Sequence, residues 1–269
     1  MASINPNGIL KGQVAVVTGA SRGIGEAIAR RYAMEGARVV VSARSVEEAD
    51  HYLPGTITNT VEQIKAAGGD ALGVRADLSL AGDRRNLIET AKDAYGHVDI
   101  LVNNAAVTYY IPVTDFPEKR FRLMMDLQVW APFELSQMVL PGMCERGGGW
   151  ILNISSHAAI HPDRTLAGRG GTVYGLCKAA LERFSTGLAQ EMFDENIGVN
   201  VISPGLVATP GTVHHKLIND SNRDIVTPME HMTEACLRLV HGDPREITGR
   251  IDYADQVIKE FELVPADLI

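Results

Sequence analysis

The stretch from Val14 to Gly25, which reads V-A-V-V-T-G-A-S-R-G-I-G, limits the possible folds of this chain more than any other. Four apolar residues in a row, three of them β-branched, predict a strand that is buried on both faces of a parallel sheet. A glycine-rich turn follows, and residues 26–33 are predicted to form a helix. Because such a turn gathers backbone N–H groups at the start of a helix, it favours an anion, most often a dinucleotide pyrophosphate.

The glycines of this turn, Gly19, Gly23 and Gly25, have separate roles in that interpretation. The first allows a tight turn, the second lets the backbone approach the phosphates, and the third lets helix and strand pack closely. Their spacing, G-x-x-x-G-x-G, differs from the commonest dinucleotide fingerprint, G-x-G-x-x-G. A plain β–α turn is the alternative, but the position between a first strand and a helix favours the cofactor site.

Composition argues against several classes of protein. The 269 residues are 45% hydrophobic and 22% charged, which is typical of a globular protein with an ample core. A net charge of −8 argues against a nucleic-acid surface, since no basic field is available to displace counterions. Three widely separated cysteines predict neither disulfides nor a metal site and fit a reducing compartment. No secretory signal and no run of about eighteen apolar residues is visible, so we expect a cytoplasmic protein without a membrane span.

Alternating patterns along the chain predict a single α/β domain over residues 1–269. Further strands are expected at 37–43, 71–76, 98–102, 150–154, 199–203 and 248–252. Helices are expected at 59–67, 83–95, 118–146, 173–193 and 228–241. Together they predict a Rossmann-type, doubly wound parallel sheet of six to seven strands with helices on both faces. Pro132 is expected to bend the helix 118–146. Residues 206–227 lack clear periodicity and are expected to form a mobile substrate lid with His214 and His215 exposed.

The end of the second strand indicates which cofactor the site prefers. In dinucleotide folds, an acidic residue near this point accepts a hydrogen bond from the ribose 2′-hydroxyl of NAD. Here Arg44 occupies the position, no carboxylate follows until Glu47, and Arg22 adds a second cation from the glycine turn. Two arginines without an acid favour a 2′-phosphate and therefore NADP(H). Asp77, at the end of the third strand, either accepts from the adenine amino group or caps local backbone N–H groups.

Polar side chains gather at the carboxyl ends of the other strands, where ligands of such sheets bind. The candidates are Asn103 and Asn104 after the fourth strand, Ser155 and Ser156 after the fifth, and Pro204 and Gly205 after the sixth. Tyr174 and Lys178 lie four residues apart at the start of the next helix and therefore share one face. A lysine ammonium beside a tyrosine stabilises the phenolate and lowers the pKa of the phenol, and a nearby serine can orient a substrate oxygen. These three kinds of group suffice for carbonyl reduction or alcohol oxidation.

Six segments in this order resemble the classical short-chain dehydrogenase/reductase family, and the resemblance extends over nearly the whole chain. They are Thr18–Gly25, Asp77-Leu78, Asn103–Ala106, Ile154–Ser156, Tyr174–Lys178 and Ser203–Thr209. The resemblance implies Tyr174 as general acid/base, Lys178 as modifier of its pKa and ligand of the nicotinamide ribose, and Ser156 as the residue that orients the substrate. It implies a cofactor site made of Gly19, Ser21, Arg22, Gly23, Ile24, Gly25, Arg44, Asp77, Leu78, Asn104, Ala105, Tyr174, Lys178, Pro204, Gly205, Val207 and Thr209. Arg22 and Arg44 resemble the NADP-preferring branch. The family's usual assembly, a tetramer or dimer, implies contacts through the helices 118–146 and 173–193.

Three features depart from the family pattern. Gln128 stands where the family usually has an Asn that holds a proton-relay water, so we include it in the catalytic group, with a relay that the longer side chain shifts or weakens. The interval between Ser156 and Tyr174 is longer than usual, which leaves the choice between Ser155 and Ser156 open. An insertion at 51–57 resembles one in hydroxysteroid-dehydrogenase-like relatives and indicates no particular substrate.

The sequence thus predicts an NADP(H)-dependent oxidoreductase that interconverts a carbonyl and an alcohol by hydride transfer. A catalytically silent NADP-binding sensor or assembly subunit is the alternative, with Gln128 as its support, and an NAD-dependent enzyme is a third interpretation. The substrate is expected to be a small, partly apolar molecule bound by residues 107–113, 157–172 and 206–227.

Overall fold

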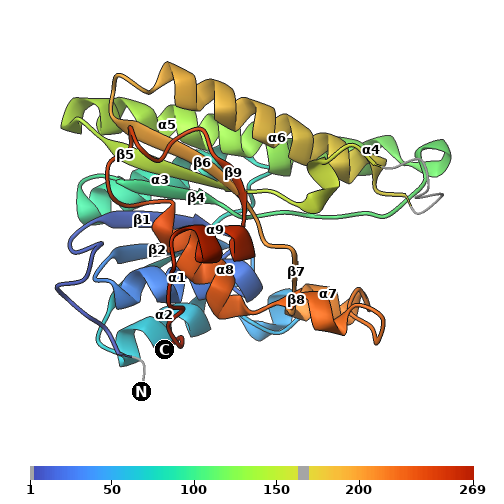
Figure 1. The fold of residues 1–269 in the computed structure, drawn as a ribbon, viewed down its shortest axis with the longest axis horizontal. Helices are drawn as coiled ribbons and strands as arrows, with labels where there is room; N and C mark the ends of the chain where they lie inside the picture. Colours follow the sequence, from blue (N-terminus) through green and yellow to red (C-terminus); the bar gives the residue numbers. More distant parts are fainter. Residues whose placement is uncertain (1–2, 163–169) are drawn as a thin grey trace.

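A computed structural model describes residues 3–162 and 170–269. Its centre is a sheet of seven parallel strands in the order β3-β2-β1-β4-β5-β6-β9 (Figure 1). The strands are β1 (Val14–Thr18), β2 (Arg38–Ala43), β3 (Asp70–Arg75), β4 (Ile100–Asn103), β5 (Gly149–Ile154), β6 (Ile197–Ser203) and β9 (Ile251–Tyr253). The predicted doubly wound parallel sheet is therefore confirmed.

Helices cover both faces of this sheet, as predicted (Figure 1). One layer contains α3 (Ala81–Tyr95), α4 (Glu118–Met125), α5 (Ala131–Arg146) and α6 (Thr172–Glu191). The other layer contains α1 (Gly23–Met34), α2 (Ile57–Ala66), α8 (Met229–Arg238) and α9 (Ala254–Glu260). Within the described parts of the chain, no helix combines the length and the apolar character that crossing a membrane requires.

The pleat of β1 divides the core between these two layers. Val17 packs with Ile28 of α1 in one apolar cluster, and its neighbour Val16 packs with Leu135 of α5 in the other. Successive side chains of a strand point to opposite faces, so a strand covered on both sides needs apolar residues without alternation. The burial of β1 on both faces therefore explains the continuous apolar run Val14–Val17. In contrast, the edge strand β3 exposes Asp70 and Arg75.

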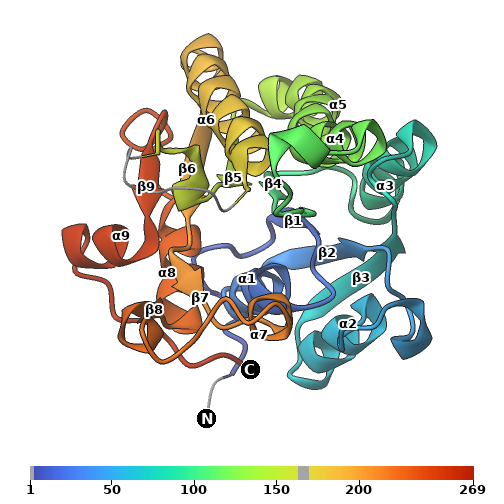
Figure 2. The same cartoon turned by 90° about the vertical axis from the view of Figure 1, so that its right-hand side faces the viewer.

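The strand order reverses between β1 and β4, which is the point where open α/β sheets bind their ligands. Figure 2 shows the molecule from the side at which the strands reach their carboxyl ends. The glycine turn follows β1 there, with α4 and α6 above the strand ends and α7 (Pro210–His214) below them in this view. The fold therefore brings segments that are far apart in the sequence to one edge.

The predicted helix 118–146 has the expected bounds, but a π-helical segment, Asp126–Trp130, lies within it and divides it into α4 and α5. Pro132 stands in the first turn of α5. Since proline has no N–H, it cannot donate the α-helical hydrogen bond to the carbonyl of Gln128. The chain uses a wider turn instead, in which the N–H of Ala131 donates to the carbonyl of Asp126. The proline thus accompanies a change of helix type and not only a bend.

The segment 206–227 contains regular elements that the sequence pattern does not reveal. β7 (Leu206–Val207) pairs in parallel with β8 (Val226–Thr227), and α7 lies between them in the sequence. Thr209 caps α7 by accepting a hydrogen bond from the N–H of Thr212 (3.1 Å). Elements this short have too few residues to show a period. The predicted exposure of His214 and His215 is confirmed, and the mobility of the segment stays a prediction.

The predicted boundaries at the carboxyl end of the chain also need correction. The strand expected at 248–252 is β9 at Ile251–Tyr253, and α9 follows it without having been predicted. Short 3-10 helices lie at Glu48–Asp50, Val113–Asp115, His157–Ala159 and Arg223–Ile225.

Candidate active site

The predicted reacting groups meet where β5 ends and α6 begins. Ser155 and Ser156 follow β5 directly, and Tyr174 and Lys178 lie in the first two turns of α6. α6 packs on both β5 and β6, so its first turns are held at the carboxyl edge of the sheet (Figure 2). The part of the predicted substrate loop at 163–169 lies outside the described residues.

Lys178 is 3% exposed, and its ammonium donates to the carbonyl of Ile154 (Nζ···O 2.8 Å). The same nitrogen lies 5.7 Å from the centre of the Tyr174 ring. Burial lowers the pKa of Lys178 to about 8, while electrostatic interactions with Cys177 and Glu182 oppose this shift. Because Ile154 is the last residue of β5, one hydrogen bond fixes the lysine to the strand that delivers the two serines.

Tyr174 differs from the expectation that its pKa is lowered. Burial raises the pKa of the Tyr174 phenol above its ordinary value, and hydrogen bonding to Ser156 and Thr108 offsets this only in part. The Lys178 ammonium is directed to the Ile154 carbonyl, so desolvation of the phenolate is the larger effect in the protein alone. The predicted direction is therefore wrong for the protein without bound molecules.

The two serines have different partners, which separates their roles. Ser155 is 2% exposed, and its hydroxyl donates to a carboxylate oxygen of Glu182 (2.6 Å). The Ser156 hydroxyl accepts a hydrogen bond from the N–H of Ala158 (3.2 Å) and faces the Tyr174 phenol. The geometry therefore favours Ser156 as the serine beside the reacting tyrosine and gives Ser155 a supporting position.

Gln128 lies in the π-helical segment and is 1% exposed. Its amide nitrogen donates to the carbonyl of Val107 (2.9 Å), which ties the helix to the segment after β4. Its side-chain oxygen is buried and has no partner among the described residues. A proton relay through Gln128 stays a prediction.

The glycine turn has the backbone geometry that the sequence predicts. Gly19 and Gly23 adopt positive φ angles of 65° and 61°. A Cβ at Gly19 would lie 2.8 Å from the Cα of Ala105, and one at Gly25 would lie 2.4 Å from the carbonyl oxygen of Gly19. α1 begins at Gly23 without a side-chain cap from Arg22, and the Glu26 carboxylate accepts from the N–H of Gly23, which leaves the other N–H groups of the first turn for an anion.

Asn104 connects this turn to β4. Its amide nitrogen donates to the carbonyls of Thr18 (2.9 Å) and Gly19 (3.1 Å). The Thr18 hydroxyl in return accepts from the N–H groups of Asn104 and Ala105. Among the other predicted cofactor residues of this region, Ser21 and Leu78 are buried and Ile24 is partly buried.

Sequence reasoning missed three polar residues that support the site. Asn153 is paired with Asn103 in the parallel register of β4 and β5, accepts from its amide (2.8 Å) and donates to Ser185 (2.8 Å). Glu182 holds Ser155, and Thr108 bonds to Tyr174. The available signal for Glu182 is its place four residues after Lys178, on the same face of α6.

The predicted adenosine end lies beside Arg22, Arg44 and Asp77. Arg44 is exposed, whereas Arg22 is half-buried and hydrogen-bonded to neighbouring backbone. Asp77 accepts hydrogen bonds from the N–H (3.0 Å) and hydroxyl (2.7 Å) of Ser79. Of the two roles left open for Asp77, the local capping role is therefore present in the structure.

The segment after β6 returns to the glycine turn. Gly205 has a φ of 72°, and Val207 is buried in β7. A Cβ at Gly23 would lie 3.3 Å from the Cβ of Thr209, so the start of α7 is in contact range of the turn. Pro204 is partly buried between β6 and β7 in the sequence.

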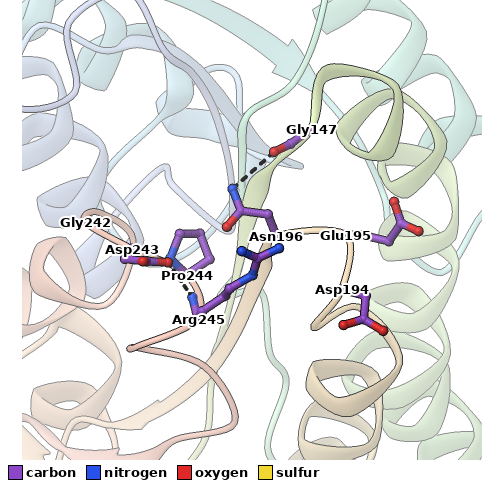
Figure 3. A pocket seen from close by; sticks show the side chains of 8 residues that line it. All are labelled: Gly147, Asp194, Glu195, Asn196, Gly242, Asp243, Pro244 and Arg245. Atoms are coloured by element: carbon purple, nitrogen blue, oxygen red, sulfur yellow. Dashed lines mark hydrogen bonds between the residues drawn. The ribbon is translucent and has the colours of Figure 1, made fainter.

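A cavity of about 580 Å³ lies elsewhere, at the amino ends of the strands (Figure 3). It is an open groove lined by Gly147, Asp194, Glu195, Asn196, Gly242, Asp243, Pro244 and Arg245. None of the predicted reacting groups borders it, so this groove is separate from the candidate active site. Among the described residues, no group of three or more His, Cys, Asp or Glu side chains is placed to hold a metal ion.

Comparison with known proteins identifies the family of this chain. Residues 13–217 match the family described as short chain dehydrogenase. An uncharacterized oxidoreductase of Methylorubrum extorquens is 42% identical over 204 residues, which cover 76% of each protein.

Two solved structures extend this likeness to the fold. L-Sorbose reductase from Gluconobacter frateurii, complexed with NADPH and L-sorbose, has a TM-score of 0.79 at 28% identity, over 94% of this chain and 96% of that one. A 7α-hydroxysteroid dehydrogenase complexed with NADH and 7-oxo glycochenodeoxycholic acid has a TM-score of 0.79 at 31% identity, over 93% and 96%. Sequence, fold and strand-end residues agree, and the chain belongs to the classical short-chain dehydrogenase/reductase family of oxidoreductases.

Proposed function

We propose that this protein is an NADP(H)-dependent oxidoreductase that interconverts a ketone or aldehyde and an alcohol, with Tyr174 as general acid/base. The observation that carries the proposal is the group of Tyr174, Lys178 and Ser156 at one strand end, with Lys178 fixed to Ile154. An oxidoreductase of this family needs a proton donor or acceptor beside the reacting carbon. These three side chains supply it without a metal ion.

The glycine turn fits a dinucleotide. The first turn of α1 offers N–H groups beyond that of Gly23, which bonds to Glu26, to a pyrophosphate, and Gly19 and Gly23 add no side chains to the turn. Arg22 and Arg44 would bind a 2′-phosphate, which supports NADP(H) over NAD(H). A bound nicotinamide supplies or accepts the hydride. L-Sorbose reductase is complexed with NADPH and the 7α-hydroxysteroid dehydrogenase with NADH, so the choice depends on this chain's own residues.

The protein groups each take one part of the reaction. Ser156 donates a hydrogen bond to the substrate oxygen, and Tyr174 gives its proton to that oxygen during reduction or removes it during oxidation. The Lys178 ammonium stabilises the tyrosinate that remains. Gln128, whose amide nitrogen donates to Val107, would use its side-chain oxygen to hold a water of the proton relay, which its longer side chain shifts or weakens.

The substrate would lie against the segment after β4. Tyr110 is 52% exposed, and the centre of its ring lies 6.4 Å from that of Tyr174 in an edge-on arrangement. An aromatic side chain beside the reacting groups supports a partly apolar carbonyl compound as the substrate. We propose that residues 206–227 act as its lid within one domain spanning 1–269. The cytoplasmic location stays a prediction.

The test is NADPH consumption with a panel of aldehydes, ketones, diketones, quinones and steroids. Tyr174→Phe removes only the hydroxyl, so turnover on any active substrate should fall by at least about 100-fold, the usual contribution of a general acid/base. Tyr95→Phe is the matched control, because that hydroxyl bonds to Asp70 at the amino end of β3, away from the carboxyl ends of the strands, and should leave turnover unchanged. Full turnover by Tyr174→Phe would show that another group moves the proton.

Two other outcomes identify the alternatives. NADPH binding without turnover on any member of the panel would favour the catalytically silent cofactor-binding protein. A lower dissociation constant for NADH than for NADPH, unchanged in Arg44→Ala, would favour the NAD-dependent enzyme.

A further inference from the structure

The Ser45–Thr56 loop, between β2 and α2, contains most of the insertion that the family resemblance does not explain. The loop is closed at its base, where the N–H of Ile57 donates to the carbonyl of Ser45 (2.9 Å) and the Thr58 hydroxyl donates to the carbonyl of Val46 (2.9 Å). Within it, a carboxylate oxygen of Asp50 accepts from the N–H of Val46 (2.7 Å). These hydrogen bonds give the loop a defined conformation, so it can hold a side chain of another segment in place.

The group that it holds is the Arg22 side chain. Arg22 donates from Nε to the carbonyl of Pro54 (2.9 Å) and from Nη2 to the carbonyl of Gly55 (2.6 Å) and the hydroxyl of Ser45 (3.1 Å). Three of the five guanidinium N–H donors are thereby assigned. The two N–H groups of Nη1 remain for another acceptor.

All three acceptors are neutral, so they orient the guanidinium without cancelling its charge. Among the described residues, no carboxylate forms an ion pair with Arg22 or with Arg44. Glu48 on the same loop attracts the charge of Arg22 from beyond ion-pair distance, and Arg44 repels it. Two neighbouring arginines that form no ion pair with a carboxylate of the described residues favour an anionic ligand.

Gly55 allows the loop to come close enough to hold Arg22. Its φ is 106°, a conformation that residues with a Cβ rarely adopt. A Cβ at this position would lie 2.5 Å from the carbonyl oxygen of Ser21 and 2.9 Å from the Cβ of Arg22. The loop backbone thus packs directly on the backbone of the glycine turn, and any larger residue would push the two apart.

We propose that the Ser45–Thr56 loop is a positioning element that holds Arg22 for a phosphate on the adenosine ribose of the cofactor. This inference rests on the proposed NADP(H) function and deepens it. An arginine that is already oriented loses less conformational freedom on binding, so the loop strengthens binding of the phosphorylated cofactor in particular. The insertion accordingly acts on the choice of cofactor and not on the choice of substrate.

Gly55→Ala tests this by separating the loop from the turn. We expect the dissociation constant of NADPH, measured by fluorescence titration, to rise about tenfold more than that of NADH, because the clash with the Ser21 carbonyl acts on both cofactors, whereas only the phosphate contact depends on Arg22. Gly68→Ala is the matched control, since Gly68 also has a positive φ (92°) but no atom within 4 Å of the added Cβ. Ser45→Ala, which removes one acceptor without a clash, should change the same ratio in the same direction and serves if Gly55→Ala does not fold.

A double-mutant cycle distinguishes the loop from the arginine. In an Arg22→Ala background, Gly55→Ala should cause no further change in the ratio of the two dissociation constants. An NADPH preference that depends on Arg22 but survives both Gly55→Ala and Ser45→Ala would overturn the role of the loop while leaving the proposed cofactor intact. A wild-type protein that binds NADPH no more tightly than NADH would overturn the proposed cofactor and this inference with it.

Discussion

At the scale of single residues, the buried lysine gives the clearest dependence on pH. The pKa of Lys178 is lowered by burial from its ordinary value of 10.5 to about 8. Between these values the unfolded chain carries the proton and the folded protein does not, so the free energy of unfolding rises with pH in this window. The whole shift corresponds to about 3 kcal/mol. Lys178→Met keeps the length of the side chain and removes the titration.

We therefore expect wild type to gain stability relative to Lys178→Met as the pH is raised from about 8 towards 10, in the absence of cofactor. Denaturant unfolding of both proteins at several pH values measures this difference directly. Titratable groups distant from Lys178 are common to both proteins and cancel, whereas Cys177, whose pKa the Lys178 charge lowers, contributes to the difference. A constant difference between the two proteins would mean that the buried lysine keeps its proton.

The two serines at the end of β5 give a second prediction at this scale. Ser156→Ala removes the hydroxyl beside Tyr174 and should lower kcat by about 100-fold, as loss of one oriented donor does in other active sites. Ser155→Ala instead leaves a carboxylate oxygen of Glu182 without its donor, which should lower the free energy of unfolding by about 1–3 kcal/mol and kcat by less than tenfold. If Ser155→Ala caused the large fall in kcat and Ser156→Ala mainly lowered the free energy of unfolding, the two serines would have each other's roles.

The sequence predicts part of this site and leaves the rest open for a physical reason. Tyr174 and Lys178 are readable because a spacing of four residues on a helix places them on one face. Ser155 and Ser156 follow the same strand, so their spacing alone does not tell which one faces the tyrosine. Their roles depend on Glu182, a partner 27 residues away that no local pattern links to them. The pKa of Tyr174 likewise depends on burial, which only the folded protein defines.

At the scale of elements, the predicted strands and helices are found where apolar periodicity is long. The π-helical segment around Gln128 is not readable because Pro132 predicts a disturbed helix without saying which irregular turn replaces it. The sequence pattern does not predict the short elements within 206–227, because β7, β8 and α7 each depend on tertiary contacts and caps. The length of an element, and not its position in the chain, decides whether the sequence pattern predicts it.

Asn200 shows how one polar residue can fix several elements. It lies fully buried in β6, where its amide donates to the carbonyls of Leu239 (3.0 Å) and Ile247 (3.1 Å) and its oxygen accepts from the N–H of Arg250 (3.2 Å). These bonds tie the end of α8 and the approach to β9 to the sheet. Asn200→Ala leaves three backbone groups without partners and should lower the free energy of unfolding by about 3 kcal/mol or more.

Asn59→Ala is the control for this prediction, because Asn59 is exposed in α2 and its side chain bonds to Gln63 in the same helix. Its free energy of unfolding should stay within about 0.5 kcal/mol of wild type. Equal effects of the two substitutions, measured by denaturant unfolding, would mean that the buried bonds of Asn200 contribute little to stability.

At the scale of the whole molecule, strand order follows from short right-handed connections once the alternation of strands and helices is known. The same alternation does not show which surfaces meet another copy of the chain. Large apolar side chains on and beside α4, α5 and α6 are exposed, and we call this set the α4–α6 face. It comprises Phe121, Trp130, Phe133, Leu176 and Phe193, which are 38–50% exposed. Trp130 and Phe133 stack on each other with ring centres 5.4 Å apart.

We propose that the α4–α6 face carries the homo-oligomer contact that the family resemblance implies. Exposed aromatic residues that pack on one another, as Trp130 and Phe133 do, mark interaction sites, and charge at the centre of such a contact is strongly unfavourable. Wild type should therefore behave in light scattering as a dimer or tetramer of the 29.1 kDa chain, and Trp130→Glu should shift it to a smaller species. Val264→Glu is the control, because Val264 is 86% exposed on the C-terminal segment, outside the α4–α6 face. If Trp130→Glu kept the wild-type mass, the contact would lie on another surface, such as the edge strand β9, and the aromatic residues of the α4–α6 face would need a different partner.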